Sequence, residues 1–108
     1  MSDYVLRPAD HARYDRAKFA KMNLVAGDRL GLGLNCFEPG QLQSTHTHAD
    51  ADKFYLILSG KARMRVGEEI VHAEANDLIW APAGEPHGVE AALERTVMLV
   101  GIAPPPGR

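Results

Sequence analysis

Three histidines are the residues of this chain whose types and spacing favour metal chemistry. His46 and His48 are separated by one residue and lie shortly before an apolar stretch. Side chains at positions i and i+2 of a strand point to the same face, so both imidazoles can converge on one point while Thr47 turns away. A lone His-x-His occurs by chance in many chains, but a third histidine, His87, follows a turn rich in proline and glycine. Together these segments predict a metal site.

Stretches that predict β-strands surround these histidines. Residues 54–58 and 78–81 are almost entirely apolar, as buried strands are, and residues 29–37 alternate leucine with glycine. Residues 82–86 contain two prolines, which cannot donate to a strand ladder, so this segment is predicted to be a loop at the rim that delivers His87. About eight or nine short strands, with frequent turn signals and no convincing helix, predict an all-β, double-sheet jelly roll.

The length of the chain predicts one domain with two appendages. With 108 residues and 45% apolar composition, the chain can form one core but not two. The predicted parts are an N-terminal arm (1–17), a barrel domain (18–103) and a flexible, proline-rich C-terminal tail (104–108). A jelly roll this small leaves strand edges exposed, and pairing of two copies covers them, so a homodimer is expected.

Charge and cysteine usage exclude several classes of partner. The net charge of −2 gives no long-range attraction to phosphate backbones or anionic membranes, so neither nucleic acid nor a membrane is an expected partner. The single cysteine, Cys36, shares the parity of the leucines in its strand and is predicted to be a buried structural residue. The first twenty residues lack the apolar core of a signal peptide, so a soluble, cytoplasmic protein is expected.

The two histidine segments resemble the two motifs of the cupin family. The residues that match the first motif are Gly40, His46, His48 and Gly60, and those that match the second are Pro82, Gly84 and His87. Both the order and the separation of the motifs fit, and together they cover about half of the chain. The resemblance implies a double-stranded β-helix (jelly-roll) cupin barrel with a metal site.

Three positions depart from the cupin pattern. The family's acidic ligand position is occupied by Lys53, and a protonated lysine is not a ligand. Either Asp52, which fits the shorter spacing from His48 that the motif permits, reaches in through a bulge, or three histidines hold the ion. Asn76 replaces the opening glycine of the second motif and also tolerates the left-handed conformation, whereas Ala91 replaces its closing asparagine.

The resemblance implies a divalent metal ion and a broad range of reactions. Imidazole ligands do not choose among Fe, Mn, Ni, Cu and Zn. With Asp52 as an oxygen donor, three nitrogens and one carboxylate leave two positions of an octahedral ion for a small-molecule substrate and for dioxygen or water. The leading hypothesis is a dioxygenase-like oxidoreductase that acts on a small organic molecule. The alternatives are a non-enzymatic module that binds a sugar or another small ligand, and a metal-dependent isomerase or lyase.

Two further residues are candidates for catalytic roles. If Lys53 faces inward, the nearby cation and desolvation lower its pKa, and its amine serves as a base or an anion anchor. In the alternative, Lys53 points to solvent and pairs with Asp50 or Glu38. The Tyr55 hydroxyl is a candidate for orienting a ligand in a small pocket, with Trp80 among the apolar residues that wall it.

Overall fold

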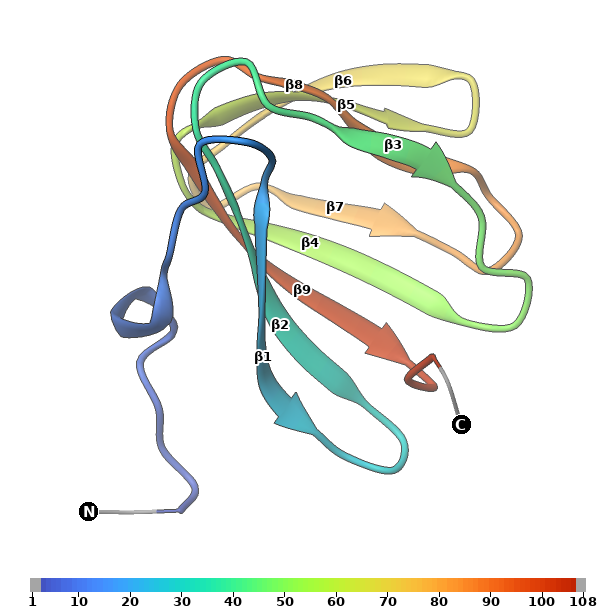
Figure 1. Cartoon of the computed structure of the whole chain (residues 1–108). Coiled ribbons are helices and arrows are strands. Elements are labelled where there is room, and N and C mark those ends of the chain that lie inside the picture. The colour runs from blue at the N-terminus through green and yellow to red at the C-terminus, as the bar shows by residue number, and fades with distance from the viewer. Residues whose placement is uncertain (1–2, 107–108) are drawn as a thin grey trace.

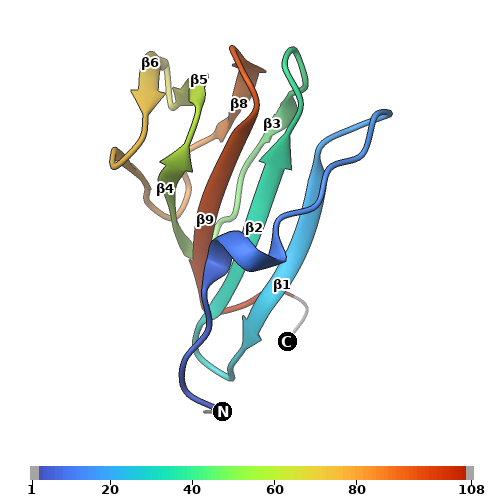
Figure 2. The same cartoon turned by 90° about the vertical axis from the view of Figure 1, so that its left-hand side faces the viewer.

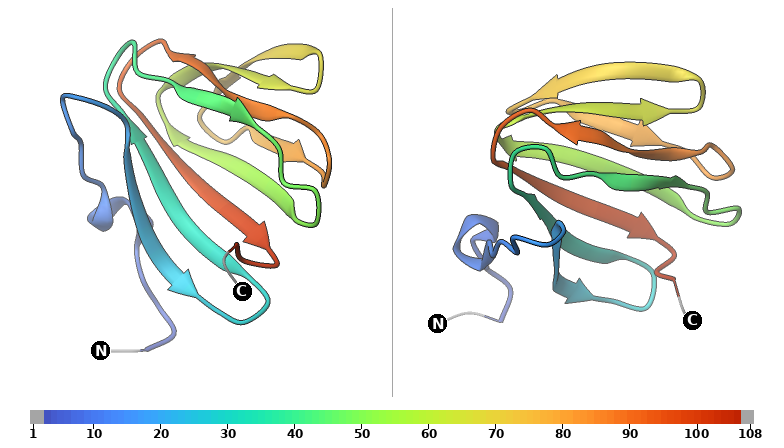
Figure 3. Two further views of the ribbon diagram at one scale, coloured as in Figure 1. Left: turned by 45° about the vertical axis from the view of Figure 1, so that its right-hand side comes forward. Right: turned by 45° about the horizontal axis from the view of Figure 1, so that its top comes forward.

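Two antiparallel β-sheets face each other in this protein, as Figure 1 and Figure 3 show. The computed structural model describes residues 3–106. The five-stranded sheet contains, in spatial order, β1 (Ala20–Ala26), β2 (Gly31–Phe37), β9 (Thr96–Ala103), β4 (Asp52–Ser59) and β7 (Leu78–Ala81). The four-stranded sheet contains β3 (Gln43–His46), β8 (His87–Ala92), β5 (Lys61–Val66) and β6 (Glu69–Glu74). The predicted all-β jelly roll is confirmed.

The main core lies between the two sheets. In β4, Tyr55 and Ile57 point inward and are fully buried, and β5 contributes Met64 from the opposite sheet. A second apolar cluster lies on the outer face of the five-stranded sheet, where Leu34 and Cys36 are fully buried. Because this sheet is apolar on both faces, its strands lack a strict alternation of apolar and polar residues. The predicted burial of Cys36 is confirmed.

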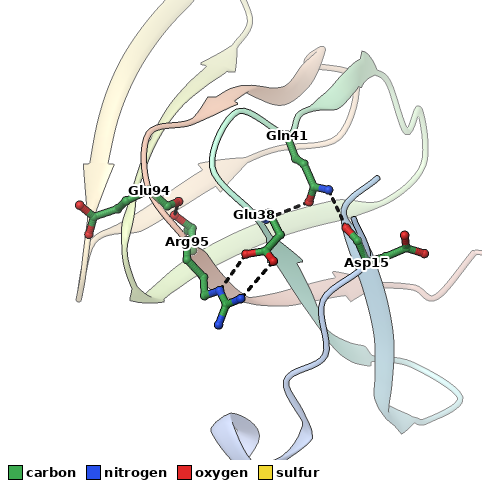
Figure 4. Close-up of polar contacts among 6 residues, drawn as sticks. Asp15, Glu38, Gln41, Glu94 and Arg95 are labelled. Atoms are coloured by element: carbon green, nitrogen blue, oxygen red, sulfur yellow. Dashed lines mark hydrogen bonds and ion pairs between the residues drawn. The ribbon is translucent and has the colours of Figure 1, made fainter. Parts of the chain in front are cut away.

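The N-terminal arm covers this outer cluster. Its 3-10 turn η1 (Pro8–His11) lies outside the five-stranded sheet (Figure 2). Gln41 connects the arm to the barrel, because its Nε2 donates to the Asp15 carbonyl at 2.6 Å and its Oε1 accepts from the Glu38 N–H at 2.8 Å (Figure 4). Arg95 forms two hydrogen bonds with the Glu38 carboxylate, at 2.8 and 3.0 Å, and its guanidinium stacks 4.0 Å from the Tyr14 ring centroid. The arm is therefore packed on the barrel.

The division of the chain into an N-terminal arm, a barrel domain and a C-terminal tail remains a prediction. Among the described residues before β1, η1 is the one helical element, and β9 ends at Ala103. Residues 1–2 of the predicted arm and residues 107–108 of the predicted tail lie outside the described residues. In the part of the chain that is described, no helix has the length and apolar character needed to cross a membrane.

Turns with positive φ angles connect the strands at the positions that the motifs predicted. Asn76 has a φ angle of 77°, so it replaces a glycine in the left-handed conformation as expected. Gly60 has a φ angle of 91° in the turn between β4 and β5. A Cβ atom on Gly60 would collide with the Arg95 carbonyl oxygen and with Thr96. This glycine is therefore required both by its φ angle and by the close approach of another backbone segment.

We expect a Gly60→Ala substitution to lower the free energy of unfolding by about 2 kcal/mol or more, since a strained φ angle alone costs about 1–3 kcal/mol and the collision adds to it. Gly40→Ala is a matched control, because Gly40 has a similar φ angle of 87° and a Cβ atom added there would have no neighbour within 4 Å. Urea unfolding of both variants measures the difference. Equal losses in the two variants would show that the contact with Arg95 and Thr96 has no cost.

The side chains of the edge strand β7 do not all lie where the sequence predicted. Trp80 does not wall an interior pocket, because it points outward from β7 and is 54% exposed. Leu78 on the same strand is 63% exposed. Phe54 also points outward, opposite Trp80 in the register of β4 and β7, and its ring covers Gly101. The expectation was wrong because both faces of β7 are apolar, so composition did not indicate which face is the interior one.

Candidate metal centre

His46, His48 and His87 meet at one point. His46, the last residue of β3, lies directly opposite His87, the first residue of β8. The ring centroids are 4.4 Å apart for His46 and His87, 5.0 Å for His46 and His48, and 5.4 Å for His48 and His87. One ligand nitrogen from each ring lies within 4.8 Å of the other two. Within residues 3–106, no other group of three or more histidine, cysteine, aspartate or glutamate side chains brings its ligand atoms this close together. The predicted convergence of the three histidines is therefore observed.

Backbone carbonyls fix the orientation of two of the rings. His46 Nδ1 lies 2.8 Å from the Ser44 carbonyl oxygen, and His87 Nδ1 lies 2.9 Å from that of Glu85. A carbonyl only accepts, so in the neutral rings each Nδ1 carries the proton and each Nε2 presents a lone pair. His87 Nε2 is buried and has no hydrogen-bond partner in the described part of the chain. A buried lone pair without a partner is rare in folded proteins, and it fits a metal ligand.

The loop between β7 and β8 is hydrogen-bonded to His48 and Asp52. The Gly84 N–H donates to the His48 carbonyl at 2.9 Å, and the Ala83 N–H donates to Asp52 Oδ1 at 2.9 Å. Asp52 is exposed, and it points to the opposite side of β4 from its buried neighbour Lys53. The structure thus does not bring Asp52 to the histidines. Its carboxylate instead holds the loop that delivers His87.

Lys53 occupies the place beside the histidines where the motif has its acidic ligand. The side chain is only 5% exposed, and Nζ lies 3.3 Å from His46 Nε2. The alternative in which Lys53 points to solvent and pairs with Asp50 or Glu38 is wrong, because Lys53 is buried and Glu38 pairs with Arg95. Desolvation, followed by the charge of nearby Lys21, lowers the pKa of Lys53 to about 8.

Burial also keeps the three imidazoles neutral. Desolvation is the largest cause that lowers the pKa of each ring, and the charge of Lys53 acts in the same direction. The pKa of His87 is lowered furthest, to about 4. Since only a neutral imidazole binds a metal ion, the site is ready for metal near neutral pH.

Tyr55 lies beneath the cluster and already has a hydrogen-bond partner. The ring is fully buried, 6.2 Å from the His87 ring and 5.0 Å from Lys53 Nζ, measured from the ring centroids. Its hydroxyl donates to Gln43 Oε1 at 3.0 Å, and burial raises its pKa above the ordinary value. Tyr55 therefore packs beside the His87 ring and the Lys53 ammonium.

A cavity of about 500 Å³ opens beside His46, His48 and Lys53. Its wall includes Asn35 and Lys21, which sequence reasoning did not select. Asn35 shares the strand parity of Gly31 and Gly33, which also line the cavity, so the alternation in residues 29–37 was the available signal. Lys21 lies directly opposite Asn35 in the register of β1 and β2.

Comparison with known proteins supports the motif assignment. A family model described as "Cupin domain" matches residues 33–102, which include both histidine segments. Among curated proteins, the chain is similar to "Uncharacterized protein SCO3923" of Streptomyces coelicolor, with 30% identity over 86 residues that cover 80% of this chain and 81% of the relative.

Solved structures share the whole architecture. The crystal structure of TT1209 from Thermus thermophilus is 36% identical, with a TM-score of 0.89 over 94% of this chain and 98% of the other. A conserved protein from Klebsiella pneumoniae with a double-stranded β-helix domain has a TM-score of 0.88 at 18% identity, over 99% of this chain and 95% of the other. The second likeness bears on the fold alone.

Proposed function

The chain belongs to the cupin domain family, and we propose that His46, His48 and His87 hold a divalent metal ion in a dioxygenase-like enzyme for a small organic substrate. The observation that carries this proposal is the pair of fixed lone pairs on His46 Nε2 and His87 Nε2, one of them buried without a partner in the described part of the chain. When bound, a redox-active ion such as iron supplies Lewis acidity and dioxygen chemistry.

The chain's own residues prepare the site for such a reaction. The carbonyls of Ser44 and Glu85 hold two rings in one tautomer, so neither of these rings must rotate to bind the ion. Lys53 can hold or release a proton at Nζ near neutral pH, since its pKa is about 8, and this suits a general acid or base. The Tyr55 ring packs against the Lys53 ammonium.

Metal content and dioxygen consumption test the proposal together. We expect untagged protein to contain close to one equivalent of iron, manganese, nickel, copper or zinc, and a His46→Ala/His48→Ala variant to contain none. The loaded protein should then consume dioxygen with at least one member of a panel of small acids, thiols and phenols, measured with an oxygen electrode. Loaded protein that converts a substrate without oxygen uptake would instead indicate an isomerase or lyase.

A non-enzymatic binding module is the second candidate, and one contact favours it. Lys53 Nζ donates to His46 Nε2 at 3.3 Å, so the amine occupies a lone pair that the ion requires. A protein that stays free of metal after incubation with each of these ions, yet binds a sugar or another small ligand, would support the module and contradict the enzyme.

We also propose that two copies of the chain form a homodimer through the exposed edge at β7. Trp80 and Leu78 project there, next to Phe54 and Leu56, their opposite residues on β4. Light scattering should give twice the monomer mass for the wild-type protein and the monomer mass for Trp80→Glu. Leu93→Glu, which changes an exposed leucine of the loop after β8, should remain dimeric; a monomeric wild type would refute the assignment.

A cytoplasmic location remains a prediction that the unpaired Cys36 supports.

A further inference from the structure

The cavity beside the histidines presents hydrogen-bond donors and positive charge, and we infer that it binds the anionic group of a small organic acid through Lys21 and Asn35. The inference deepens the proposed function and rests on it in one respect: the remainder of the acid would lie next to the metal ligands. A volume of about 500 Å³ is in the range of small-molecule sites.

Asn35 supplies a buried donor that lacks an acceptor. The residue is 1% exposed, lies in the wall of the cavity, and its Nδ2 donates to no atom of residues 3–106. Buried amide groups in folded proteins almost always have partners, so an unpaired one requires an explanation. An acceptor oxygen of a ligand in the cavity would provide the missing partner. The Asn35 amide is therefore the proposed hydrogen-bond donor to the ligand.

Lys21 places a positive charge on the same side of the sheet. It lies directly opposite Asn35 in the register of β1 and β2, and opposite residues of paired strands point to one face. Its charge is also near enough to the histidine end of the cavity to act on His46, His48 and Lys53. The Lys21 ammonium and the Asn35 amide thus form two donors on adjacent strands, with Lys53 at the inner end.

No acidic side chain in the described wall of the cavity neutralises these lysines. The wall contains no aspartate or glutamate, and neither Lys21 nor Lys53 forms an ion pair within residues 3–106. The remaining wall is largely apolar, with Val100 and Ile102 from β9. Two ammonium groups beside an apolar wall favour an anion with a short carbon skeleton and disfavour a cation. A carboxylate, which accepts several hydrogen bonds, matches both Lys21 and Asn35.

Calorimetric titration with two probes of equal length tests this inference. Succinate carries carboxylates, and its diamide has the same skeleton without charge. Both are titrated into metal-free protein and into protein loaded with zinc. We expect succinate to bind at least tenfold more tightly than the diamide in both forms. Equal affinities for the two probes would overturn the inference, whatever the metal content is.

Three substitutions assign the affinity to the proposed residues. Lys21→Met and Asn35→Leu should each weaken succinate binding at least fivefold and leave the zinc content unchanged. Lys18→Met is the matched control, since Lys18 is exposed and absent from the described wall, and it should bind succinate as the wild type does. Lys21 is itself exposed, so its variant stays informative even if Asn35→Leu fails to fold. Wild-type affinity in Lys21→Met would contradict the assignment.

The metal-free titrations separate this inference from the proposed function. If the wild-type protein holds no metal but its succinate binding depends on Lys21, the inference stands and the metalloenzyme proposal fails. If the protein holds zinc but binds succinate no better than the diamide, the metal site stands and the anion site is refuted.

Discussion

A Lys53→Glu variant is expected to bind zinc at least about tenfold more tightly than the wild-type protein at pH 7. Lys53 Nζ lies 3.3 Å from His46 Nε2, so the substitution removes a positive charge and a competing donor from the ligand atom. It also adds the carboxylate that the cupin motif has at this position. Groups that only orient metal ligands already change affinity by about 10- to 100-fold, and this change acts at the ligands themselves. Competition with a chromophoric chelator measures the affinity.

The pH dependence of zinc affinity distinguishes the removal of Lys53 from the gain of a ligand. The ammonium form of Lys53 opposes the cation, and the pKa of this group is about 8. Wild-type affinity should therefore rise from pH 7 through pH 8, as the amine loses its proton, and level off at about pH 9. In Lys53→Met this rise should disappear, with affinity at pH 7 above that of the wild type. A Lys53→Met variant that keeps the rise would show that Lys53 does not compete with the ion.

The barrel and the three histidines could be predicted from the sequence because both depend on local signals. Turns at Gly60 and Asn76 and the loop before His87 mark strand ends whatever the strands pack against. Residues i and i+2 of a strand share a face, so the sequence predicted that His46 and His48 converge; in the structure His46 ends β3 and His48 lies two residues beyond it. These features need no knowledge of tertiary contacts.

The choice between Asp52 and Lys53 needed the register of β4, which local spacing does not determine. A shift of one residue exchanges the inward and outward side chains of a strand. Both spacings fit the motif, and charge argued for Asp52 as the inward residue. The observed register pairs Lys53 with Ala81 and Ile102, so the lysine is buried and Asp52 reaches the loop at Ala83. Long-range pairing with β7 and β9 decided a question that the motif left open.

A His87→Ala variant is expected to lose zinc affinity by more than about a hundredfold. His87 is the most buried of the three ligands, and its ring is held by the Glu85 carbonyl with Nε2 unpaired within the described structure. Loss of this nitrogen leaves two ligands, and even the partners of metal ligands are worth about 10- to 100-fold. Zinc content after dialysis and chelator competition give the result. Circular dichroism verifies that the variant is folded.

His72→Ala provides the matched control for this loss. His72 lies on β6 with its side chain exposed, outside the histidine group, so its removal deletes an imidazole without touching the proposed ligands. Zinc retained by His72→Ala and lost by His87→Ala would assign the ion to the cluster. Equal affinity in both variants would mean that the unpaired Nε2 of His87 is not a ligand. The cavity would then act through Lys53, Lys21 and Asn35 alone, as a binding module for anions.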